Sequence, residues 1–133
     1  MDLDTATLNS IMPLGAHLGL ELAEAGPGRV IATMAWAEHL CTAGGALHGG
    51  ALMALADSVG GTVAFLNLTD GATTSTISSS TVFLRGVRAG TVTATGTLVH
   101  RGRTTIVVQT VLSDDDGREV ARTTQSQAVL GPA

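Results

Sequence analysis

Residues 49–67 have the apolar periodicity of one long helix. At about 100° per residue, the apolar side chains fall on one side, as a core-facing stripe should. They are Leu52, Leu55, Val59, Val63 and Leu66. The opposite side carries small or apolar residues and one acid, Asp57. Because a helix that is apolar or small all round is usually covered on both sides, we expect Asp57 on a covered face. A covered carboxylate is costly unless it is paired or used, so Asp57 is a candidate functional residue.

The rest of the chain is mostly strand-like. Alternating or β-branched runs bounded by turn residues predict six strands. We place them at residues 18–24, 29–36, 73–84, 91–100, 104–113 and 119–130, with a short helix at 4–12 and a glycine-rich loop at 41–47. One long helix beside five or six antiparallel strands predicts an α+β fold in which the sheet wraps around the helix. We expect a single domain over residues 1–133.

Composition excludes several classes of protein. The 133 residues carry a net charge of −4, and all seven cations are arginines, so a nucleic-acid partner is not expected. A single cysteine, Cys41, excludes an internal disulfide framework. The apolar stretch at 51–68 is interrupted by Asp57, Ser58 and a glycine pair, and reads as a buried helix. The N-terminus lacks a basic leader, so we expect a cytoplasmic protein without a membrane partner.

The expected helix begins at His48-Gly49-Gly50. The N–H groups of a first helical turn have no partner within the helix, and the helix dipole makes that end partly positive. Glycine lets another group approach the backbone closely. Such an end can hold an anion or polarise a carbonyl oxygen. The alternative is that the glycines merely turn the chain.

Together these segments resemble the hotdog-fold acyl-CoA thioesterases, in particular the branch typified by the phenylacetate-degradation thioesterases. The resemblance rests on residues 45–50, which read Gly-Ala-Leu-His-Gly-Gly, on Leu-Ala-Asp at 55–57, and on Thr76 with Phe-Leu-Arg at 83–85. It runs through almost the whole chain. It implies a hotdog fold in which the sheet surrounds the long helix.

The resemblance assigns roles to the helix residues. Asp57 would be the catalytic carboxylate, either activating water or attacking the thioester. The N–H of Gly49 would polarise the thioester carbonyl, and His48 would support that loop and the bound thioester. Many relatives have Asn or Gln six residues before the histidine, where this chain has Thr42. Thr42 can still donate one hydrogen bond.

A hydroxyl that orients the water is implied on the following strand. Counting back from Phe-Leu-Arg selects Thr76, whereas counting forward from Asp57 selects Ser75, and both stay open. The acid that often follows two positions later is replaced by Ser78. Cys41 is the weaker candidate nucleophile, since it is a lone loop thiol.

Substrate contacts are expected from arginines and from the helix face opposite the core. Coenzyme A carries phosphates, which suit the bidentate arginine fork. We expect two of four arginines to contact the nucleotide: Arg85, Arg88, Arg101 and Arg103. Gly50, Met53 and Phe65 would line the acyl group, with an aryl or medium-chain group implied by the resemblance. The histidines lack metal-ligand spacing, and we expect neither a metal nor another cofactor.

The helical rise separates the two candidate groups. Eight residues at 1.5 Å each put Gly49 and Asp57 about 12 Å apart, too far for both to touch one thioester carbon. If both act, Asp57 must meet Gly49 of a partner subunit, which predicts a homodimer with two composite sites. The resemblance makes a homotetramer plausible.

Three functions remain open. The first is hydrolysis of an acyl-CoA thioester to a carboxylate and free coenzyme A. The second is a non-enzymatic acyl-CoA-binding module of the same fold, which would have no need of a covered carboxylate. The third is a 3-hydroxyacyl thioester dehydratase, ranked lowest because such enzymes usually place a histidine and an acid across the substrate.

Overall fold

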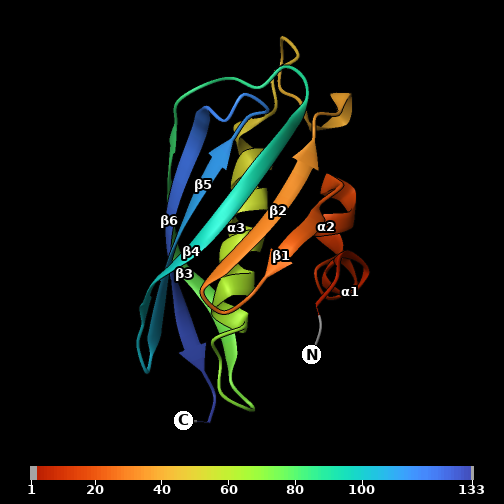
Figure 1. Cartoon of the computed structure of the whole chain (residues 1–133). Coiled ribbons are helices and arrows are strands. Elements are labelled where there is room, and N and C mark those ends of the chain that lie inside the picture. Colours follow the sequence, from red (N-terminus) through yellow and green to blue (C-terminus); the bar gives the residue numbers. More distant parts are fainter. Residues whose placement is uncertain (1–2, 133) are drawn as a thin grey trace.

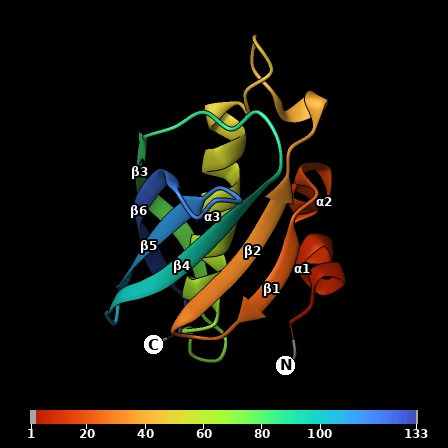
Figure 2. The ribbon, with the colours of Figure 1, turned by 45° about the horizontal axis from the view of Figure 1, so that its top comes forward.

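In the computed structural model, which describes residues 3–132, six antiparallel strands form one sheet that curves around a long helix (Figures 1 and 2). The elements are α1 Thr5–Ile11, α2 Pro13–Leu18, β1 Glu21–Ala25, β2 Arg29–Ala35, the 3-10 turn η1 Glu38–Leu40, α3 Gly49–Phe65, β3 Thr73–Phe83, β4 Thr91–Arg101, β5 Thr105–Ser113 and β6 Glu119–Leu130. The strand order is β1-β2-β4-β5-β6-β3. The α+β hotdog architecture expected from the sequence is confirmed.

The central helix α3 packs against β2, β3, β4, β5 and β6. Its predicted core stripe is confirmed at Leu52, Leu55, Val59 and Val63, which are all buried, whereas Leu66 at the end of the stripe is half-buried. The helix ends at Phe65, two residues before the expected end. Asn67 accounts for this end, because its side-chain amide donates to Val63 O at 2.8 Å and to Pro27 O at 2.7 Å. None of the helices in residues 3–132 is long and apolar enough to cross a membrane.

The N-terminal region differs from the sequence expectation in one place. Asp4 caps α1 as expected, accepting the Thr7 N–H at 2.8 Å. Residue 18, however, does not begin a strand. Pro13 starts a second short helix, α2, because a first-turn position has no N–H bond to lose, and α2 continues to Leu18. Gly19, at φ 70°, ends α2, so β1 begins only at Glu21.

Strand β3 lies at one edge of the sheet. It pairs with β6 on one side only, and nearly all of its residues are exposed. Thr76 pairs with Gln127 and Ser78 pairs with Ser126, so Ile77 is an extra residue that forms a β-bulge. A bulge changes which side chains face each side of the sheet. Here the strand turns Thr76 toward α3, where it reaches a helix side chain.

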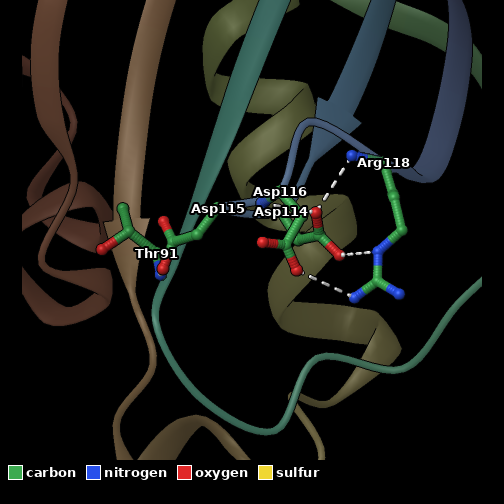
Figure 3. A network of polar contacts seen from close by, with 5 residues as sticks. All are labelled: Thr91, Asp114, Asp115, Asp116 and Arg118. Carbon is green, nitrogen blue, oxygen red and sulfur yellow. Dashed lines mark hydrogen bonds and ion pairs between the residues drawn. The ribbon is translucent and has the colours of Figure 1, made fainter.

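The hairpin turn between β5 and β6 is an exposed acidic cluster (Figure 3). Asp114 Oδ1 accepts the N–H groups of Asp116 and Arg118, both at 3.0 Å. The Nε of Arg118 lies 3.0 Å from Asp114 Oδ2, and Asp115 accepts the Thr91 N–H at 3.2 Å. Desolvation raises the pKa of Asp114, but these hydrogen bonds and the arginine charge outweigh it and hold the pKa below its ordinary value. The turn predicted from the Asp-Gly pair is confirmed.

Candidate active site

Asp57 lies at the middle of α3, on the face turned away from the core. Its Oδ1 lies within hydrogen-bond distance of two donors, Thr76 Oγ1 of β3 at 3.0 Å and Gln125 Nε2 of β6 at 3.1 Å. No group in residues 3–132 donates to its Oδ2. The carboxylate is therefore held by one oxygen, and the other oxygen is available to react.

Two glutamines beneath Asp57 were not anticipated from the sequence. Gln125 and Gln127 point inward from β6 and are 1% and 2% exposed. Gln125 Nε2 also donates to Gln127 Oε1 at 3.0 Å. A signal was available, because both glutamines stand at core-facing positions of an alternating strand. Polar residues at such positions need partners, and these partners lie around Asp57.

The sequence left open whether Ser75 or Thr76 provides the hydroxyl beside Asp57, and the two residues are placed differently. Thr76 Oγ1 contacts Asp57 directly. Ser75 lies beside the same cavity and makes no side-chain hydrogen bond to Asp57. Strand alternation accounts for the difference, since neighbouring residues face opposite sides of a sheet. Ser78 lies beyond the bulge and pairs with Ser126.

The start of α3 presents a free backbone donor, the Gly49 N–H. His48 caps the helix, and its Nδ1 accepts the Gly50 N–H at 2.7 Å, so a neutral His48 ring has its proton on Nε2. Its carbonyl accepts the Ala51 N–H at 2.9 Å. Within residues 3–132 the Gly49 N–H has no acceptor. A Cβ at residue 49 would lie 3.2 Å from the Phe83 ring, so the ring closely covers this glycine.

The loop before α3 is held by backbone contacts and one arginine. The Thr42 N–H bonds to Ala46 O at 2.9 Å, and the residue is exposed. Arg88 Nη1 donates to Gly44 O at 2.8 Å. The half-buried Cys41 thiol lies 3.3 Å from Ala37 O. Thr42 is thus placed near the helix start, whereas Arg88 is engaged with the loop.

A cavity of about 330 Å³ opens beside Asp57 between α1, α3 and β3. Its apolar wall comes from Leu8, Ile11, Met12 and Phe65. Met53 lies on the same face of α3 as Asp57 but does not line this cavity. Gly50 lies about one turn before Met53, nearer the start of α3, and does not line it either. Asp57 itself is exposed in the isolated chain. Residues 3–132 of the same chain therefore do not supply the cover expected over this face.

The four candidate arginines are divided between the two ends of α3. Arg85 lies by the helix start, where it shares a shallow hollow with Gly49. Arg101 and Arg103 lie at the other end, where they line a cavity of about 450 Å³ together with Asn67. Within residues 3–132 neither of these two guanidinium groups has an ion-pair or side-chain hydrogen-bond partner. All four arginines therefore cannot serve one site within a single chain.

The fold defines the class as that of the hotdog-fold thioesterases. A family model described as the thioesterase superfamily matches residues 44–121, and the chain belongs to that superfamily. The proofreading thioesterase EntH of Cronobacter turicensis is 31% identical, with 98% of this chain and 96% of EntH covered. The resemblance stated from the sequence is confirmed, and the names of the relatives support a thioester hydrolase.

Solved structures agree with this classification. A mutant thioesterase from Pseudomonas aeruginosa superposes with a TM-score of 0.90 at 30% identity, covering 98% of this chain and 96% of its own. A hypothetical thioesterase with coenzyme A from Streptococcus pneumoniae gives a TM-score of 0.78 at 30% identity, covering 84% of this chain and 86% of its own.

Proposed function

We propose that this protein hydrolyses acyl-CoA thioesters to a carboxylate and free coenzyme A. The observation that carries the proposal is the Asp57 carboxylate, held by Oδ1 and free at Oδ2, at an apolar cavity. As a base, Oδ2 takes a proton from water while the hydroxide attacks the thioester carbon. As a nucleophile, Oδ2 attacks that carbon and water hydrolyses the resulting anhydride. In the first route the C–S bond breaks as the tetrahedral intermediate collapses, and the thiolate takes the proton that Asp57 accepted from water. In the second route the C–S bond breaks as the anhydride forms, the thiolate takes a proton from solvent, and hydrolysis of the anhydride returns that proton and regenerates the Asp57 carboxylate.

The second half of the site is proposed to come from a partner subunit. Gly49 N–H is a free donor suited to a developing oxyanion, but it lies about 12 Å along the same helix from Asp57. Gly49 of the partner subunit would therefore polarise the carbonyl above Asp57. Two uncovered features next to Asp57 support this arrangement: the exposed face that carries Met53 and Phe65, and the unpaired edge of β3. The assembly is a homodimer, or two such dimers in a homotetramer.

The acyl group is proposed to occupy the cavity beside Asp57. Its volume of about 330 Å³ lies at the small end of ligand pockets. The apolar side chains of α1 and Phe65 suit an aryl or medium-chain acyl group. Thr76 would orient the attacking water, since its hydroxyl already contacts Asp57.

The phosphates of coenzyme A are proposed to bind Arg101 and Arg103. These two guanidinium groups line one cavity without partners among residues 3–132, whereas Arg88 is engaged by Gly44. The similar chain from Streptococcus pneumoniae was solved with coenzyme A. Replacing both arginines by alanine should raise KM for an acyl-CoA about 10-fold or more with little change in kcat. Replacing Arg122, which pairs with Glu119, is the matched control.

A substrate screen tests the activity. Free-thiol release is measured with aryl-, short-, medium- and long-chain acyl-CoAs, and the aryl or medium-chain compounds should be turned over fastest. Saturable binding without thiol release from any of them would contradict hydrolysis and favour the binding module.

Mixed subunits test the composite site. Gly49→Pro removes the N–H at a helix position that tolerates proline, and Gly49→Ala retains the N–H while adding a similar Cβ. Asp57→Asn and Gly49→Pro chains should each be inactive. Refolded together they should recover about a quarter of the wild-type activity, because half of the dimers then carry one intact site. No recovery would contradict a site shared between subunits.

A further inference from the structure

The buried glutamines belong to one continuous chain of hydrogen bonds that ends at Asp57. Thr74 Oγ1 donates to the Ala128 carbonyl at 2.8 Å. Gln127 Nε2 donates to Thr74 Oγ1 at 3.1 Å, and Gln125 Nε2 donates to Gln127 Oε1 at 3.0 Å. The remaining Gln125 N–H reaches Asp57 Oδ1. The chain thus links the β6 backbone to the carboxylate.

The backbone end fixes the direction of every bond in this chain. A main-chain carbonyl can only accept, so the Thr74 hydroxyl must donate to it and is left as an acceptor. The Gln127 amide must therefore turn its nitrogen to Thr74 and its oxygen to Gln125. That oxygen in turn requires the nitrogen of Gln125, which leaves an N–H facing Asp57. An N–H, and never a carbonyl oxygen, is presented to the carboxylate.

Thr76 cannot replace Gln125 in this arrangement. The Thr76 hydroxyl has one proton and two acceptors in reach, Asp57 Oδ1 at 3.0 Å and Gln127 Oε1 at 2.6 Å. The Gln125 amide has two protons and serves both acceptors at once. Gln125 is therefore the constant donor to Oδ1, whichever acceptor the hydroxyl serves.

Gly60 of α3 makes room for this arrangement. A Cβ at residue 60 would overlap the Gln125 side-chain amide, chiefly at Oε1. That oxygen is buried and has no hydrogen-bond partner among residues 3–132. An unpaired buried acceptor is unfavourable. The amide nevertheless keeps the orientation that points its nitrogen at Asp57, as the fixed direction of the chain requires.

We infer that Gln125 and Gln127 are positioning residues that hold Asp57 by Oδ1 and so select Oδ2 as its reacting oxygen. The inference rests on the proposed hydrolysis for its catalytic consequence. Gln125 acts directly on the carboxylate, and Gln127 acts through Gln125. Neither glutamine needs to touch the substrate.

Near-isosteric variants test the inference. Gln125→Met keeps the size of the side chain and removes its donor, and it should lower kcat about 10- to 100-fold with KM within about twofold of wild type. Gln127→Met should change kcat in the same direction by less. Thr110→Val also removes a buried polar group from the sheet, away from Asp57. It is the control and should leave kcat and KM unchanged. A kcat for Gln125→Met equal to that of Thr110→Val would overturn the inference.

A second measurement does not depend on turnover. In ¹H–¹⁵N spectra the side-chain amide signals of Gln125 should shift in Asp57→Ala, whereas those of Gln109 on β5 should not. Unmoved Gln125 signals would overturn the hydrogen-bond chain. A wild-type protein that releases no thiol would overturn the proposed function alone, and the two failures are thereby distinguished.

Discussion

Asp57 and Asp114 are both held by several donors, but in opposite ways. Asp114 takes its donors from residues within four positions, among them an arginine, and both of its oxygens are engaged. Asp57 takes neutral donors from residues 19 and 68 positions away, and among residues 3–132 these donors reach Oδ1 alone. Asp114, whose two carboxylate oxygens both accept hydrogen bonds within its own turn, stabilises that turn. Distant neutral donors that orient an acid and leave one of its oxygens open agree with the catalytic role proposed for Asp57.

The largest effect should separate these two acids directly. Asp57→Asn should lower kcat for a good acyl-CoA substrate about 10²- to 10⁴-fold, because the amide can neither take a proton nor attack. Asp114→Asn should leave kcat within about twofold. Thiol release under saturating substrate measures both. Comparable losses in the two variants would break the distinction.

A smaller effect should come from the hydroxyl on the β-bulged strand. Thr76→Val keeps the shape of the side chain but loses the hydrogen bond to Asp57, and kcat should fall about 10-fold or more. Thr76→Ser retains the hydroxyl and should recover most of that loss. If the valine and serine variants have the same kcat, the hydroxyl has no part in the reaction.

The close contact between Gly60 of α3 and Gln125 of β6 can be tested by measuring the free energy of unfolding. Gly60→Ala should destabilise the protein by about 1–3 kcal/mol, since its Cβ overlaps Gln125. In a Gln125→Ala background the same change should instead stabilise by about 0.5–1 kcal/mol, as Gly→Ala in a helix does. Urea unfolding of the four proteins gives the coupling between the two residues. Equal costs in both backgrounds would show that Gly60 does not serve Gln125.

The smallest effect should be the pH dependence of the Asp114 turn. Because the folded pKa of Asp114 lies below its ordinary value of 3.8, the turn contributes stability that is complete above that value. The contribution is lost as the pH falls through the folded pKa. Wild type should therefore have a higher Tm than Asp114→Asn at pH 7, and the difference in Tm should shrink as the pH falls below 3.8. A difference in Tm that does not shrink on acidification would contradict this assignment.

Periodicity predicted the parts of the molecule that depend on local sequence. The stripe from Leu52 to Val63 identified α3, and alternation identified most strands within a few residues. The error at residue 18 arose because Pro13 starts a helix as readily as it stops one. The sequence did not predict that Gln125 and Gln127 lie next to Asp57, because this arrangement depends on the pairing of β6 with β3, which joins residues far apart in the chain. The Ser75 and Thr76 ambiguity had the same origin, since only the paired strand shows which residue faces α3.

The pairing of β3 with β6 has a consequence for how the site is made in the cell. During translation Asp57 emerges early, but Gln125 follows 68 residues later. At about 5–20 residues per second this interval lasts roughly 3–14 s. During this interval β3 has no β6 to pair with, and the Asp57 carboxylate lacks the Gln125 donor that orients it. A nascent chain stalled before residue 119 would therefore contain Asp57 without the β6 donor that orients it, and the proposed activity would require β6 to be synthesised.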